Sequence, residues 1–148
     1  MRVLLISSSF SGWSNMPEEM QSMVSRICKQ QRFFFGCGGG LNEVTVAPNG
    51  DIYECQRMYK KPIANISEDL SPCEASNHFQ ISVDERSICK DCWARYLCGG
   101  GCLHQTEMLT GSTRPYPQFC AMKQNLAEAS IIKICEIRAQ NMFESGLE

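Results

Sequence analysis

The sequence predicts a small α+β fold: a small antiparallel β-hairpin with cysteine-rich loops, a C-terminal helix, and an N-terminal strand-helix segment. The apolar residues alternate after Glu43, as in a strand, and recur every three or four residues after Pro117, as in a helix. The chain has ten cysteines in 148 residues, a high share for a globular domain. This length suits one compact domain with an appendage and is too short for a (β/α) barrel, which needs at least ~200 residues.

Residues 1–36 are predicted to form one strand and one helix. The apolar run at residues 3–6 suits a short strand and is too short for a signal peptide, which needs ~7–15 apolar residues. Pro17 followed by two acidic residues is typical of a helix start. The apolar face then repeats at helical spacing at Met20, Val24, Ile27 and Cys28. One strand and one helix cannot close a core alone, so we expect this segment to be the remnant of a larger domain or to contact one.

A hairpin is predicted around the turn at residues 48–51. Val44 and Val46 precede this turn and Ile52 follows it, and Gly50 suits a position with positive φ. Residues 56–88 contain prolines and many polar residues. They are predicted to be irregular, with short strands at residues 63–66 and 79–83.

The C-terminal helix shows the clearest periodicity of the chain. Its apolar positions are Met122, Leu126, Ala129, Ile132, Cys135, Ala139 and Met142, with Pro117 near the start. Residues 141–148 are predicted to fray. Cys28 and Cys135 lie on apolar helical stripes, so both are predicted to pack in the core as small hydrophobic side chains.

Charge and hydropathy restrict the partners of the chain. The 14 basic and 16 acidic residues give a net charge of -2, and no basic stripe suggests nucleic-acid binding. No apolar stretch approaches the ~20 residues of a membrane span. Since no export signal is evident, we expect a cytoplasmic protein whose cysteines stay reduced. Reduced cysteines are more often metal ligands or catalytic groups than disulfides.

Seven of the ten cysteines form an ordered pattern. They are Cys37, Cys55, Cys89, Cys92, Cys98, Cys102 and Cys120. Gaps of two or three residues let one turn aim two sulfur atoms at a common centre, and distant cysteines close such a site. Seven thiolates do not divide evenly into four-thiolate zinc sites, but they do divide into a four-ligand and a three-ligand iron–sulfur cluster. A zinc-ribbon-like site using Cys89, Cys92, Cys98 and Cys102 is the alternative, and a disulfide framework is a further one.

The glycines next to these cysteines favour a cluster. The run from Gly99 to Gly101 fills the gap between Cys98 and Cys102. A backbone without Cβ atoms can pass close to a bulky inorganic core and can aim N–H groups at its sulfur atoms. Trp93, Tyr96 and Leu97 are predicted to form a dry wall around it.

The pattern C-x12-G-x4-C, then C-x2-C-x5-C-x3-C, then a distal cysteine resembles the SPASM domain, the auxiliary-cluster region of many radical SAM enzymes. The runs from Val46 to Arg57 and from Cys89 to His104 look like the subgroup that modifies peptides or protein subunits. The resemblance covers about residues 37–125. Residues 1–36 then correspond to a remnant of, or contact to, the radical SAM barrel, and residues 126–148 to the C-terminal helix and a frayed tail.

The resemblance implies two auxiliary [4Fe–4S] clusters. The first is expected on Cys37, Cys55 and Cys102, and the second on Cys89, Cys92, Cys98 and Cys120. Several family members supply a fourth ligand to the first cluster from a segment that corresponds to residues 38–49, where this chain has no cysteine. An open or substrate-ligated iron is the expectation there, with Cys73 as another source.

The C-x3-C-x2-C motif that holds the S-adenosylmethionine-binding cluster is missing from this sequence. The resemblance therefore implies electron transfer and substrate docking for a peptide or protein maturase, with S-adenosylmethionine bound only through a radical SAM core on another domain or subunit. No catalytic residue is assigned to this chain alone. The alternative function is a non-catalytic peptide- or protein-binding module, stabilised by zinc or a cluster, which includes one half of a split enzyme.

Overall fold

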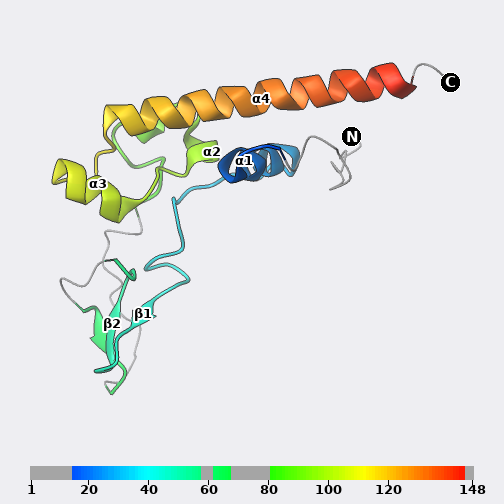
Figure 1. Cartoon of the computed structure of the whole chain (residues 1–148). Coiled ribbons are helices and arrows are strands. Elements are labelled where there is room, and N and C mark those ends of the chain that lie inside the picture. Colours follow the sequence, from blue (N-terminus) through cyan, green and yellow to red (C-terminus); the bar gives the residue numbers. More distant parts are fainter. Residues whose placement is uncertain (1–14, 58–61, 68–80, 146–148) are drawn as a thin grey trace.

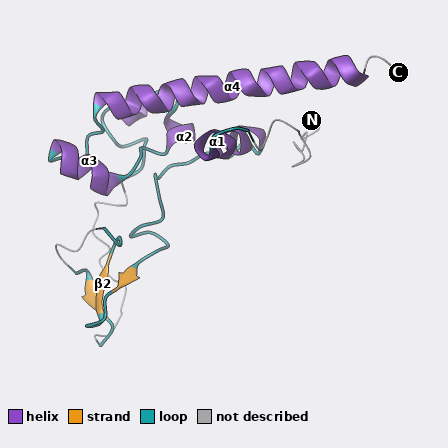
Figure 2. Cartoon of the chain, in the orientation of Figure 1, coloured by secondary structure: helices purple, strands orange, loops and turns teal. Residues whose placement is uncertain are grey.

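The computed structural model describes residues 15–57, 62–67 and 81–145 (Figure 1). Its elements are α1 (Glu18–Cys28), β1 (Thr45–Val46), β2 (Asp51–Tyr53), β3 (Ala64–Asn65), the 3-10 turn η1 (Cys89–Asp91), α2 (Arg95–Cys98), α3 (Leu103–Thr110) and α4 (Pro117–Ser145). A three-stranded antiparallel sheet together with these helices confirms the predicted α+β class (Figure 2). The strand predicted at residues 3–6 lies outside the described residues.

The helical part is built on the packing of α1 against α4. Glu18 and Glu19 lie in the first turn of α1, where the helix dipole favours negative charge. The fully buried Val24 packs with Met16 and Ile134, and Cys28 lies half-buried against this group. Met23, one residue earlier, packs with Ala94 and Ala127. The predicted apolar face of α1 therefore anchors both α4 and the segment that leads into α2.

Helix α4 is longer than predicted. It continues to Ser145, so the fraying expected from residue 141 is wrong as far as 145, because the first strong helix-breaking residue after Pro117 is Gly146. Cys135 is exposed on this helix, which corrects its predicted place in the core. The face toward α1 is instead formed by Ala127, Ser130, Ile134 and Ile137.

The predicted hairpin is confirmed. Strand β1 pairs with β2 in the register Thr45↔Tyr53, and β3 falls within the strand expected at residues 63–66. Gly50 has a φ of +89°, as the turn requires. Residues 81–83, the described end of the strand expected at 79–83, are not a strand.

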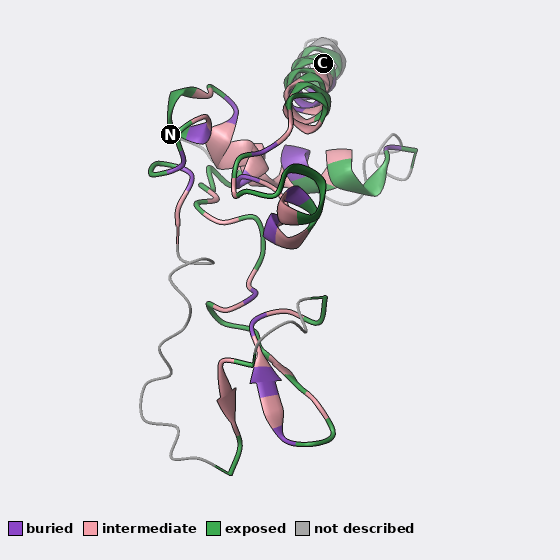
Figure 3. Cartoon of the chain, turned by 90° about the vertical axis from the view of Figure 1, so that its left-hand side faces the viewer, coloured by how far each residue is buried: buried purple, intermediate pink, exposed green. Residues whose placement is uncertain are grey.

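The sheet and the helices lie at opposite ends of the chain's fold (Figure 1). Most buried positions lie on the helices and the loops between them, whereas β2 alone among the strands carries a buried residue, Ile52 (Figure 3). Within the described ranges, no helix combines the length and apolar composition needed to cross a membrane. Four of the cysteines lie on or directly beside η1, α2 and the start of α4: Cys89, Cys92, Cys98 and Cys120.

Candidate metal centre

Four of the predicted ligands line one cavity. Cys89, Cys92, Cys98 and Cys120 all contribute to its wall, and its volume is about 230 Å³. Cys89 begins η1 and Cys92 follows it, Cys98 ends α2, and Cys120 lies in the first turn of α4. This is the complete ligand set expected for the second cluster.

Short backbone hydrogen bonds place these thiols. The N–H of Cys92 donates to the carbonyl of Cys89 at 2.9 Å, which closes the turn between them. The N–H of Cys98 donates to the carbonyl of Ala94 at 2.9 Å, and Ala94 is itself buried against Met23 and Ala127. The apolar faces of α1 and α4 therefore fix the end of α2 and the sulfur atom that it carries.

The cavity favours neutral thiols as long as no cation is present. Burial raises the pKa of Cys89 to about 11, with Arg86 opposing the rise and the three other thiols adding to it. Burial also raises the pKa of Cys98 and of Cys120. Because burial makes these three thiols resist ionisation, a positive metal centre beside them would favour their thiolate forms.

Helix α4 adds two polar side chains to the thiols. The Nε2 group of Gln124 donates a hydrogen bond to the Cys92 sulfur at 3.4 Å. Lys123 lines the same cavity, and its charge lowers the pKa of Cys98 against the effect of burial. A backbone hydrogen bond from Gly100 acts on Cys98 in the same direction. These contacts orient the sulfur atoms and stabilise negative charge on them.

The rest of the cavity wall differs from the prediction. Its apolar part comes from Ile88, Ala94, Pro115 and Phe119. Trp93 is 51% exposed and lies outside the lining, as do Tyr96 and Leu97, so the dry wall predicted from these three residues is wrong. The reason is the direction of α2, which turns Leu97 toward the helical core and Tyr96 toward Asp84.

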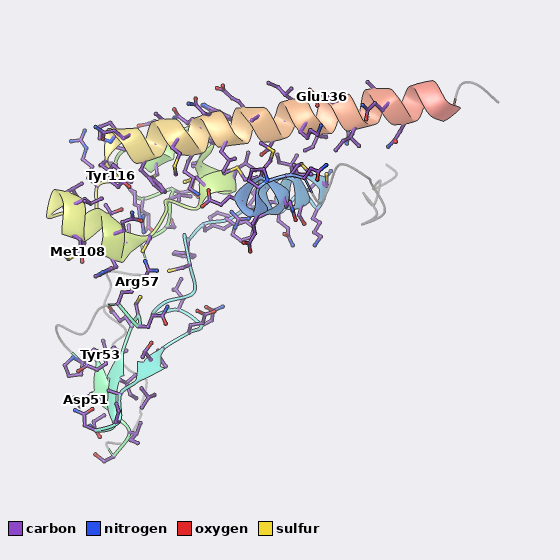
Figure 4. The ribbon with its side chains drawn as sticks, in the orientation of Figure 1. Asp51, Tyr53, Arg57, Met108, Tyr116 and Glu136 are labelled. Carbon is purple, nitrogen blue, oxygen red and sulfur yellow. The ribbon has the colours of Figure 1, made fainter. Side chains whose placement is uncertain are left out.

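Two of the three cysteines expected for the first cluster, Cys37 and Cys55, lie close to Gly39. The Cys37 sulfur atom and the Cβ atom of Cys55 each lie 3.6 Å from where a Cβ on Gly39 would stand. Arg57 donates its backbone N–H to the Cys55 sulfur at 3.5 Å. Figure 4 shows Arg57 between the sheet, which carries Asp51 and Tyr53, and the helices. The chain leaving β2 thus brings Cys55 to the junction of the two parts.

Glycine contacts bring the segment of Cys102 beside the segment of Cys37. A Cβ on Gly36 would overlap the carbonyl oxygen of Gly101. The residues directly before Cys37 and Cys102 are therefore in backbone contact. Gly99 has a φ of +69°, and a Cβ there would lie 2.6 Å from the carbonyl oxygen of Phe35. The glycine run therefore allows two segments of the backbone to approach each other closely, whereas the sequence predicted close approach to an inorganic core.

The described residues include no group of three or more Cys, His, Asp or Glu side chains close enough together to hold a single metal ion. The nine cysteines in the part of the chain that the structure describes are free thiols. Cys73, the other expected source of a ligand, lies outside the described residues. Sequence reasoning missed Arg86, Phe119, Lys123 and Gln124, although the last two could have been found at three and four residues after Cys120 on a predicted helix.

No family model, curated protein or solved structure matches this chain.

Proposed function

We propose that the chain holds two [4Fe–4S] clusters and serves as the SPASM-type auxiliary-cluster domain of a radical SAM enzyme that modifies a peptide or protein. The observation that carries the proposal is the cavity shared by Cys89, Cys92, Cys98 and Cys120. The resemblance implies that these four thiols hold one cluster, and all four line this cavity.

The number of cysteines in the pattern favours clusters over zinc. Seven thiolates do not divide evenly into four-thiolate zinc sites, but they do divide into a four-ligand and a three-ligand cluster. The four thiols around one cavity of about 230 Å³ are those assigned to the four-ligand cluster.

When bound, such clusters accept and release single electrons. The residues of this chain provide the surroundings. Phe119 and Pro115 exclude water from one side of the cavity, and Gln124 orients the Cys92 sulfur. Exclusion of water and hydrogen bonds to sulfur are two of the means by which a protein sets a cluster potential.

The first site suits substrate docking. Only three cysteines of the pattern are assigned to it, which leaves one iron without a protein thiolate. Cys37 is exposed, so this side of the site is open to solvent. A substrate thiolate or another donor of the peptide would complete the coordination, while the radical is generated on a separate core that binds S-adenosylmethionine. The reduced thiols that this function requires are typical of the cytoplasm.

The proposal is tested by removing predicted ligands two at a time. The full chain is loaded anaerobically with iron and sulfide, alone and as the pairs Cys89→Ala/Cys92→Ala and Cys37→Ala/Cys55→Ala. Each pair is expected to retain about four irons, because a [4Fe–4S] cluster needs its thiolates. Cys135→Ala, which removes an exposed cysteine outside the pattern, should retain about eight.

Two outcomes would contradict the proposal. One is a wild-type chain that binds about one zinc and no iron, which supports the zinc-stabilised binding module instead. The other is an equal iron content in both cysteine pairs and in wild type, which would show that the iron is bound elsewhere.

A further inference from the structure

Arg86 is a buried cation between the two predicted sites. Only 6% of the residue is exposed. Its Nε group donates to the carbonyl of Ile81 at 3.3 Å, and its Nη1 group donates to the carbonyl of Gly100 at 3.1 Å. The guanidinium carries five N–H donors in a fixed plane, so donors remain for further acceptors.

No carboxylate forms an ion pair with Arg86 within residues 15–57, 62–67 and 81–145. Arg95, by contrast, pairs with Asp84 at 3.1 Å near the surface. A buried charge without a counter-ion costs several kcal/mol, so natural proteins rarely keep one. Among the described residues the buried guanidinium thus has no carboxylate partner, and an anionic ligand beside it would supply the counter-charge.

The groups that face Arg86 belong to both sites. Burial lowers the pKa of Arg86, and the sulfur atoms of Cys89, Cys98 and Cys37 oppose this effect in that order. Cys89 and Cys98 are expected ligands of the second cluster, and Cys37 of the first. One guanidinium thus lies within electrostatic range of thiols from both.

Arg86 also makes a close contact with Gly100. Gly100 has a φ of +81°, and a Cβ there would lie 2.7 Å from Nη1 of Arg86. This glycine stands midway between Cys98 and Cys102, which are assigned to different clusters. Arg86 therefore holds the short loop that joins the two sites, and no larger residue would fit beneath it.

We propose that Arg86 is the shared counter-ion of the two clusters: a positioning residue that fixes the loop from Cys98 to Cys102 and makes the reduction potentials of both clusters more positive. The inference rests on the proposed function. Seven thiolates and two oxidised clusters carry a summed charge of about -3, and each one-electron reduction adds another negative charge. A fixed positive charge between the sites lessens the cost of both additions.

The test compares two substitutions at one position in the full chain. Arg86→Lys keeps the charge, whereas Arg86→Gln keeps a hydrogen-bond donor and loses the charge. Wild type and variants are loaded with iron and sulfide and titrated with dithionite, and the reduced clusters are followed by electron paramagnetic resonance. Arg86→Gln is expected to make reduction of each cluster about tenfold less favourable, a shift of about 59 mV. Arg86→Lys is expected to stay close to wild type.

Arg138→Gln is the matched control. It removes the same charge from an exposed position on α4, where the arginine acts on Cys28, a thiol outside the pattern. Both potentials should be unchanged in this variant. Loss of loading in Arg86→Gln with full loading in Arg86→Lys would also support the shared counter-ion, because both side chains can donate hydrogen bonds but only Lys keeps the positive charge.

A shift in one cluster only, or equal shifts in Arg86→Gln and Arg86→Lys, would overturn the inference and leave the proposed function intact. A wild-type chain that binds no iron would overturn both. The two failures are therefore distinguishable from the first measurement.

Discussion

Cys89 and Cys37 differ in what surrounds their sulfur atoms, and this difference can be measured without any metal. Burial favours the neutral thiol of Cys89 and raises its pKa to about 11. At pH 8 its reactive thiolate is therefore about one part in a thousand. We predict that iodoacetamide modifies Cys89 far more slowly than the exposed Cys37, and that the Cys89 rate rises about tenfold per pH unit from pH 8 to 10. Equal rates by mass spectrometry would contradict the buried site.

The hydrogen bond from Gln124 to Cys92 should act on one cluster only. Gln124→Leu removes a donor that stabilises negative charge on sulfur, a contribution of about 1 kcal/mol or about 40 mV. We predict a more negative potential for the second cluster and no change in the first, measured by redox titration of the loaded chain. Asn125→Leu introduces the same side chain at an exposed neighbouring position and should change neither. Equal effects of the two variants would contradict a specific effect of the Gln124 hydrogen bond on the second cluster.

At the scale of elements, the packing around Gly100 differs from the packing around Gly111, which caps the C-terminus of α3. Gly100 and Gly111 both have positive φ, but a Cβ at Gly111 would meet nothing within 4 Å, whereas one at Gly100 would clash with Arg86. We predict that Gly111→Ala lowers the free energy of unfolding by about 1 kcal/mol. Gly100→Ala should lower it by at least about 1 kcal/mol more, because overpacking adds to the backbone strain. Urea unfolding of the apo chain checks this, and equal losses would contradict the packed loop.

The elements that could be predicted are those whose own residues specify them. Pro17 and the apolar stripe of α1 mark that helix, and Gly50 marks the hairpin turn. Helix α3 was missed because its apolar residues do not repeat along one face: Leu103 is buried, while Met108 and Leu109 are exposed. Its buried polar residue, Thr106, is satisfied locally by donating to the carbonyl of Cys102, which no apolar pattern reveals.

At the scale of the whole molecule, the grouping of the cysteines could be predicted from the sequence, but the residues that surround them could not. The resemblance to the SPASM domain grouped Cys89, Cys92, Cys98 and Cys120, and the fold brings these four to one cavity. The position of Arg86 depends on how residues 81–86 pack beneath the glycine loop, a tertiary contact that no local pattern specifies. The wall of the cavity depends likewise on the direction of α2, which is why Phe119 lines it and Trp93 does not.

The charge and burial of the molecule together support the proposal that it binds metal clusters. Three thiols of the second site have pKa values raised by burial, and one buried guanidinium lies between the two sites. Both features cost free energy, and the proposed binding of a cationic metal core to thiolates beside Arg86 would compensate both.

The most direct test is a count of iron and acid-labile sulfide on the full chain after anaerobic reconstitution and removal of unbound metal. Two [4Fe–4S] clusters predict about eight irons and about eight sulfides per chain, with broad visible absorption that dithionite bleaches. Fewer than about four irons per chain without that absorption would contradict the account.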